Sequence, residues 1–229
     1  MKALPIAARG LFILCLPFLL LTASLGWVTN SLWIYPQSPE KYHVREDLAA
    51  AGLKLSATEL KGIYASLIGY FNSDEEDINL TVVQDGKTIP LLTPEEVIHF
   101  RDVKGLIRLD YGVLAGTLAY SLAYAGVCLF WRRPRYRRHL AWGLVGGGSL
   151  TLGLMLALGL GIRFGFEELF WQFHVISFSN LYWLAEGNMH LLFPEDFFYN
   201  AALLCAAVTG ALAVILGGVG GFILSRIDK

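Results

Sequence analysis

The sequence predicts a mainly α-helical membrane protein, in which a bundle of four transmembrane helices carries a small extracytoplasmic α+β cap. Two observations support this fold class. In the 229-residue chain, 55% of the residues are hydrophobic and only 16% are charged, whereas soluble domains are about a quarter charged. Four segments are also long and apolar enough to cross the roughly 30 Å hydrocarbon core of a bilayer. We assign these spans to residues 11–34, 111–131, 140–162 and 200–224.

The first span resembles a signal peptide at its start, because Lys2 and Arg9 precede it. Its apolar run is longer than the roughly 7–15 residues of a signal-peptide core, and no small-residue cleavage site follows. We therefore expect a retained membrane anchor. The glycines of the third and fourth spans are typical of close helix packing in lipid.

The basic residues predict the orientation of the spans. Residues 132–139, between spans two and three, contain five arginines. Short loops rich in Lys and Arg stay in the cytoplasm. Lys2 and Arg9 place the N-terminus on the same side, and Arg226 and Lys229 do so for the C-terminus. The prediction is that both ends face the cytoplasm.

Two segments then face outward, residues 35–110 and residues 163–199, and together they should form the cap. The first should contain a helix from Leu53 to Phe71, started by a capping box of Ser56 and Glu59. Two strands, Leu80–Val83 and Thr88–Leu92, should follow around an Asp-Gly turn. Thr93, then Pro and two Glu, is a strong helix start, and this helix should lead into the second span.

Several function classes are disfavoured. A net charge of −1 argues against a nucleic-acid partner. The three cysteines, Cys15, Cys128 and Cys205, lie singly in apolar stretches, which favours neither disulfides nor a metal site. No nucleophile-elbow or H-E-x-x-H motif is present. We predict no cofactor and no metal.

One candidate catalytic group is His99, in the second turn of the helix that begins near Thr93. Asp102 lies three residues later on the same helix face. A carboxylate beside an imidazole suits a general base, although an ordinary surface histidine is an alternative. Lys104 and Arg108 continue the polar side and are candidates to bind lipid phosphates or a polar substrate.

A second candidate is His174, whose neighbours in the sequence are nearly all apolar or aromatic. A polar group in such a setting is a functional candidate by default, with a satisfied interfacial histidine as the alternative. Aromatic residues such as Trp183 are typical of the outer bilayer interface. Glu195 and Asp196 should lie at the N-terminus of the fourth span, where negative charge is favoured.

Two passages resemble motifs of a bacterial membrane family that was long without a known function and includes the lipoprotein intramolecular transacylase. Residues 96–104, which contain His99, Asp102 and Lys104, resemble the family segment before the second span. Residues 173–198 resemble its second outward loop through His174, Phe178, Trp183 and the Leu-Phe-Pro-Glu run that ends at Glu195. The chain departs from the family at Val175 and at residues 185–189.

The resemblance implies a transferase of the bacterial cytoplasmic membrane, with diacylated lipoproteins and membrane lipid as partners. Such an enzyme moves the sn-2 acyl chain of the diacylglyceryl-cysteine to its α-amino group and yields a lyso-form lipoprotein. The implied catalytic residues are His99 as the base, Asp102 as its partner and His174 as a donor to the oxyanion or a participant in proton transfer. Substrate-binding residues would be Lys104, Arg108, Trp183 and Glu195.

Two alternative functions remain open on the sequence alone. One is a metal-dependent membrane hydrolase that uses His99, His174 and acidic partners. The other is a non-enzymatic assembly protein whose cap binds a partner. A transporter is disfavoured because the spans contain almost no charge.

Overall fold

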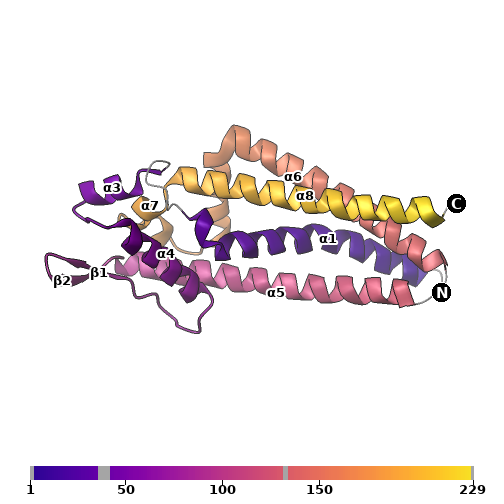
Figure 1. Cartoon of the computed structure of the whole chain (residues 1–229), viewed down its shortest axis with the longest axis horizontal. Helices are drawn as coiled ribbons and strands as arrows, with labels where there is room; N and C mark the ends of the chain where they lie inside the picture. Colours follow the sequence, from indigo (N-terminus) through magenta and orange to yellow (C-terminus); the bar gives the residue numbers. More distant parts are fainter. Residues whose placement is uncertain (1–2, 36–41, 131–133, 228–229) are drawn as a thin grey trace. The chain divides into compact units, whose positions relative to one another are not determined.

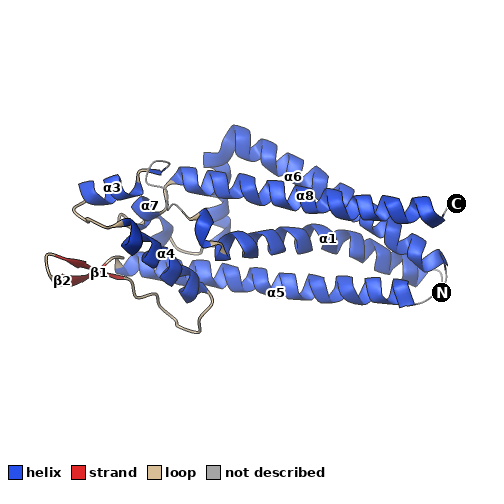
Figure 2. Cartoon of the chain, in the orientation of Figure 1, coloured by secondary structure: helices blue, strands red, loops and turns tan. Residues whose placement is uncertain are grey.

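The computed structural model describes residues 3–35, 42–130 and 134–227, and it is mainly helical (Figures 1 and 2). Lys2, Arg132, Arg133 and Lys229, which contribute to the predicted orientation, lie outside the described residues. Four helices are long and apolar enough to cross a membrane, within Ile6–Asn30, Pro94–Phe130, Arg135–Ser177 and Glu195–Ile227. The predicted number of spans and the mainly helical fold class are confirmed.

The chain divides into two compact units. The first unit comprises Met1–Gly26, Asp110–Phe164 and Leu203–Lys229, and the second comprises Trp27–Leu109 and Gly165–Ala202. All four long helices belong to both units: α1 (Ala3–Asn30), α5 (Pro94–Phe130), α6 (Pro134–Ser177) and α8 (Glu195–Ile227). At about 1.5 Å per residue, the 37 residues of α5 extend about 55 Å. This length exceeds the roughly 30 Å thickness of the apolar core of a bilayer, so one helix can contribute residues to both units.

In the first unit, parts of α5 and α6 run alongside α1 (Ala3–Asn30) and α8 (Glu195–Ile227) (Figure 1). A Cβ atom on Gly148 would lie 2.8 Å from the backbone oxygen of Ala213, and one on Gly220 would lie 2.7 Å from that of Ala141. The two helices α6 and α8 therefore approach so closely that only glycine fits at these points. The predicted role of these glycines in packing is confirmed.

The second unit contains the short elements of the chain. They are η1 (Leu32–Ile34), α3 (Val44–Ala50), α4 (Ala57–Phe71), β1 (Thr81–Gln84), β2 (Lys87–Pro90), η2 (Tyr182–Leu184) and α7 (Met189–Leu192). Its buried core is aromatic and aliphatic, with members from Tyr35 to Phe100 and from Met189 to Phe197. Residues from the two predicted outward segments thus share one hydrophobic core, which makes the second unit compact by itself.

Short sequence motifs determine where the helix α4 begins and where the β1–β2 hairpin turns. Ser56 accepts a hydrogen bond from the backbone N–H of Glu59, and the Glu59 carboxylate accepts one from Ser56 in return. Hydrogen bonds from Ser56 lower the pKa of Glu59. The hairpin β1–β2 pairs Val82 with Ile89 and turns through Asp85 and Gly86, both with positive φ, as a two-residue type I′ turn requires. The capping box and the hairpin are confirmed.

Several predicted boundaries differ from the structure. The helix predicted from Leu53 begins at Ala57, because the Ser56 cap sets its first turn. Residues 134–139 and 163–177, predicted as loops, are largely helical parts of α6. Proline is favourable at the first helical position and arginine is a good helix former, so α6 begins at Pro134 within the basic segment.

Candidate active site

The first histidine of the site is positioned by the start of α5. The backbone N–H of Thr93 donates to Glu96 Oε2 at 2.8 Å, and the N–H of Glu96 donates to Thr93 Oγ1 at 3.3 Å. This capping box fixes the first turn, so His99 follows in the next one. On a neighbouring face Val97, Phe100, Val103 and Ile107 pack into the core of the second unit. His99 is 6% exposed, which is unusual for a histidine on a charged helix.

The second histidine lies in the last turn of α6, after a break in the helix at Gly165 (φ −158°, ψ 46°). His174 is 8% exposed. Its Nδ1 atom lies 2.7 Å from the backbone oxygen of Phe170. A carbonyl oxygen can only accept, so Nδ1 carries the proton and Nε2 keeps its lone pair in the neutral ring.

The fold brings the two histidines together. Their ring centroids lie 6.2 Å apart and their planes differ by 26°. Aromatic rings surround them: Phe178 lies 4.9 Å from His99, and Phe170 and Trp183 lie 4.3 and 4.8 Å from His174. Burial among apolar rings disfavours the charged imidazolium, so both histidines are held as neutral rings that can accept a proton.

Asp102 has a partner other than His99. Its Oδ2 accepts a hydrogen bond of 2.8 Å from Asn180 Nδ2. Asn180 in turn accepts one of 3.0 Å from the backbone N–H of Tyr182, which begins the single turn η2 that carries Trp183. Among the described residues no hydrogen bond joins Asp102 to His99, so the carboxylate holds the turn of Trp183 and acts on His99 only through space.

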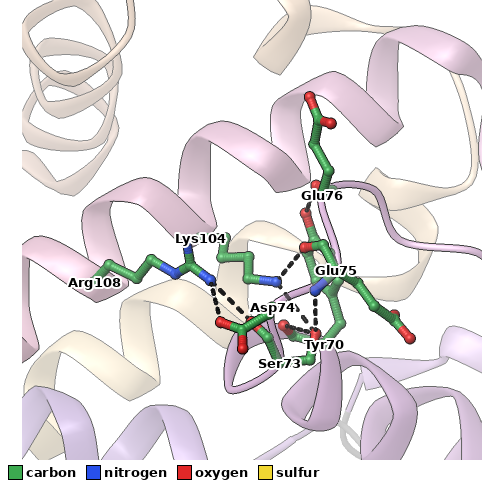
Figure 3. A network of polar contacts seen from close by, with 7 residues as sticks. All are labelled: Tyr70, Ser73, Asp74, Glu75, Glu76, Lys104 and Arg108. Carbon is green, nitrogen blue, oxygen red and sulfur yellow. Dashed lines mark hydrogen bonds and ion pairs between the residues drawn. The ribbon is translucent and has the colours of Figure 1, made fainter.

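Lys104 and Arg108 reach towards the acidic loop that follows α4 (Figure 3). Lys104 Nζ donates to Ser73 Oγ at 3.3 Å and to the backbone oxygen of Glu75 at 2.6 Å, and it lies 4.0 Å from the centre of the Tyr70 ring. Arg108 donates to the backbone oxygen of Ser73 at 3.0 Å. Both cations tie this loop to α5, and their predicted role in substrate binding stays a prediction.

The two other predicted site residues, Trp183 and Glu195, lie in different surroundings. Trp183 is 6% exposed and lies against His174. Glu195 is exposed in the first turn of α8, as predicted from the favourable effect of negative charge at a helix N-terminus. No contact of Glu195 with the histidines is observed among the described residues, so its role in binding stays a prediction.

The sequence did not reveal how strongly Glu96 holds the site together. Its side chain is fully buried, and its second oxygen, Oε1, accepts a hydrogen bond of 2.5 Å from the backbone N–H of Met189. Gly187 packs so closely on this carboxylate that a Cβ atom there would overlap it. Asn180 was missed for the same reason: each partner lies far away in the sequence, and no local pattern indicates it.

The metal-binding side chains of the described residues are not grouped into a site. Within residues 3–35, 42–130 and 134–227, no group of three His, Cys, Asp or Glu side chains is arranged to hold an ion. The cysteines Cys15, Cys128 and Cys205 are free. The geometry therefore gives no support to the metal-dependent hydrolase.

Comparisons with known proteins identify the family. The family model for the lipoprotein intramolecular transacylase Lit matches residues 10–198. Curated protein sequences give no significant match.

Solved structures give the same fold. One of the membrane-integral lipoprotein intramolecular transacylase Lit from Bacillus cereus has a TM-score of 0.80 and 21% identity, and covers 99% of this chain and 98% of that chain. Variants of that protein with a histidine replaced by arginine or by alanine have TM-scores of 0.75 and 0.74, also at 21% identity, and cover 100% and 98% of this chain and 96% of theirs. The family match, which spans most of the sequence, together with the four apolar helices, shows that this chain belongs to the lipoprotein intramolecular transacylase family and is a multi-pass membrane acyltransferase.

Proposed function

We propose that the chain moves the sn-2 acyl group of a diacylglyceryl-cysteine N-terminus to the α-amino group of the same cysteine. The observation that carries this proposal is the pair of buried, neutral histidines, His99 and His174, with ring centroids 6.2 Å apart. Acyl transfer from an ester to an amine needs one proton removed from nitrogen and one delivered to the leaving oxygen. Two adjacent imidazoles supply both functions.

Every proton that is removed in this reaction is also delivered, and no covalent enzyme intermediate is needed. The amine attacks the ester carbonyl, the new C–N bond forms, and the ester C–O bond then breaks. His99 takes the proton of the attacking nitrogen, and His174, whose Nε2 keeps its lone pair, shares in passing it to the departing glyceryl oxygen. The histidines return to their neutral state after each turnover. No nucleophilic residue is required, because donor and acceptor are parts of one substrate.

The remaining predicted residues are given supporting roles. Asp102 stabilises positive charge on His99 through space while it holds Asn180. Lys104 and Arg108 keep the loop at residues 73–75 against α5. Trp183 packs on His174, and Glu195 provides an exposed negative charge in the first turn of α8, which attracts a cationic lipoprotein N-terminus.

We also propose that the second unit faces outward from a bacterial cytoplasmic membrane and forms the extracytoplasmic cap, with both chain ends in the cytoplasm. The arginines of residues 132–139 support this orientation. Lipid-anchored substrates in the outer leaflet would then meet the histidines on their own side of the membrane. No metal and no cofactor enters the proposed reaction.

The direct test is the chemical form of lipoproteins made in a bacterial host that lacks its own transacylase. Expression of the wild-type chain should convert diacylglyceryl N-termini to the lyso form, with one acyl chain on the α-amine and one on the glyceryl group. Tandem mass spectrometry of released N-terminal peptides distinguishes the two, since the total mass is unchanged but the fragments differ. Unchanged diacylglyceryl peptides in cells that contain the folded protein would refute the proposed function.

The proposed orientation has its own test. In a chain with Cys15, Cys128 and Cys205 replaced by alanine, we introduce a cysteine by Lys87→Cys at the start of β2 or by Arg226→Cys in the last turn of α8. Both positions are exposed. A maleimide that cannot cross membranes should label the first in intact spheroplasts, and the second only after the membrane is permeabilised. The reverse pattern would invert the orientation.

A further inference from the structure

Two buried polar atoms at the site have no partner. Among the described residues of the second unit, the buried side-chain nitrogens without a hydrogen bond are His99 Nδ1 and Trp183 Nε1. Buried polar atoms in native structures are nearly always paired, and each exception calls for an explanation. An unmade hydrogen bond at a buried donor costs roughly 1–3 kcal/mol. Both exceptions occur around one aromatic cluster, which indicates a ligand rather than a packing fault.

The two atoms differ in what they can do. The neutral ring of His99 can accept or donate through Nδ1, depending on its tautomer, whereas the indole nitrogen of Trp183 can only donate. The indole ring lies 4.8 Å from the imidazole of His174, with 33° between the planes. The missing partner of Trp183 is therefore an acceptor, placed beside the histidine pair.

Two other side-chain donors of the site, on His174 and Asn180, each already have an acceptor. His174 Nδ1 donates to the backbone oxygen of Phe170, which leaves Nε2 without a proton in the neutral ring. Asn180 Nδ2 donates to Asp102. His174 can therefore donate through Nε2 only after it has gained a proton, so the negative oxygen that forms when the amine attacks needs another donor at that moment.

We propose that the Nε1–H of Trp183 donates a hydrogen bond to the carbonyl oxygen of the sn-2 ester and holds the oxyanion of the tetrahedral intermediate. As the C–N bond forms, the π electrons of the carbonyl move to this oxygen, and they return when the ester C–O bond breaks. The indole keeps its proton throughout, so it stabilises charge without taking part in proton transfer. A donor fixed in advance in a site shielded from water is the most effective form of such stabilisation.

The fold fixes this donor through a chain of contacts. Asp102 accepts from Asn180, and Asn180 accepts from the N–H of Tyr182, the residue before Trp183. The ring of Trp171 also packs against this indole, with centroids 4.8 Å apart and planes at 76°. The indole is thus held through its backbone and by a neighbouring ring, as a preorganised donor must be.

The proposal rests on the proposed function and is tested by removing the N–H while keeping an aromatic ring. In detergent, with a synthetic dipalmitoylglyceryl-cysteine lipopeptide as substrate, Trp183→Phe should lower kcat about 10²–10³-fold, as for the loss of one oxyanion donor, and leave KM within about threefold. Trp142→Phe is the matched control, since it changes an indole of the first unit that is 48% exposed, and it should keep kcat within about threefold.

A second substitution separates catalysis from packing. Benzothienylalanine at position 183 replaces the N–H by sulfur at nearly the same size, so it should preserve thermal stability and reproduce the fall in kcat. Full kcat in this variant would overturn the oxyanion role, even if Trp183→Phe fails to fold. An inactive wild-type protein would instead refute the proposed function, so the two failures are distinguishable.

Discussion

Replacing His99 by alanine is expected to lower the rate of lyso-form production about 10²–10⁴-fold, the contribution typical of a positioned general base. His99 is only 6% exposed, and the ring of His174 lies beside it, with centroids 6.2 Å apart. Without it, the attacking amine has no acceptor for its proton at that place. The measurement is the initial rate with a purified enzyme and a diacylglyceryl-cysteine lipopeptide, followed by mass spectrometry of the product.

The matched control is His139→Ala, which removes a histidine of the first unit whose side chain lies 3.5 Å from Arg9. This variant should keep its rate within about twofold. Thermal unfolding in the same detergent must show that the His99 variant is folded. A folded His99→Ala enzyme at the wild-type rate would remove His99 from the mechanism.

Asp102 variants separate its two effects. Asp102→Asn keeps an oxygen that can accept from Asn180 but loses the charge, whereas Asp102→Ala loses both. If the carboxylate acts mainly by holding the turn of Trp183, the asparagine variant should stay near wild type and the alanine variant should lose kcat. Equal losses in both would assign the effect to the charge near His99.

Replacing Glu96 by alanine is expected to have the largest effect on stability, a loss of roughly 3–6 kcal/mol in the free energy of unfolding. The estimate counts two hydrogen bonds to a charged group at about 1.5–3 kcal/mol each. Both donors are backbone N–H groups, of Thr93 and Met189. Their loss releases the start of α5 and the segment around Gly187. Chemical unfolding in detergent measures the loss in the free energy of unfolding.

Hydrogen exchange gives the local effect of the same change. The amide of Met189 should exchange faster in Glu96→Ala, and peptides of β1 and β2 should be unaffected. Glu95→Ala is the control, because Glu95 is exposed in the same helical turn and should contribute only about 0.3–1 kcal/mol through the helix dipole. Unchanged exchange at Met189 in the Glu96 variant would show that the hydrogen bond contributes little.

The sequence by itself determined the local elements of the protein. Four apolar stretches predicted four spans, and all four are confirmed. The capping boxes at Ser56 and Thr93 and the Asp-Gly turn were readable because every partner lies within three residues of the other. Both histidines also stood out, His174 because its sequence neighbours are apolar and His99 because Asp102 follows three residues later. The family motifs gave the type of reaction that the family match then supported.

Only the tertiary structure decided how these parts meet. Glu96 reads locally as a helix cap, yet its second oxygen binds an amide 93 residues away. Asp102 seemed to be the partner of its helical neighbour His99, but its hydrogen bond goes to Asn180, 78 residues away. Such pairings depend on which faces of distant segments pack into one core. A local sequence pattern does not indicate which segments these are. The closeness of His99 and His174, on which the proposed chemistry depends, is of the same kind.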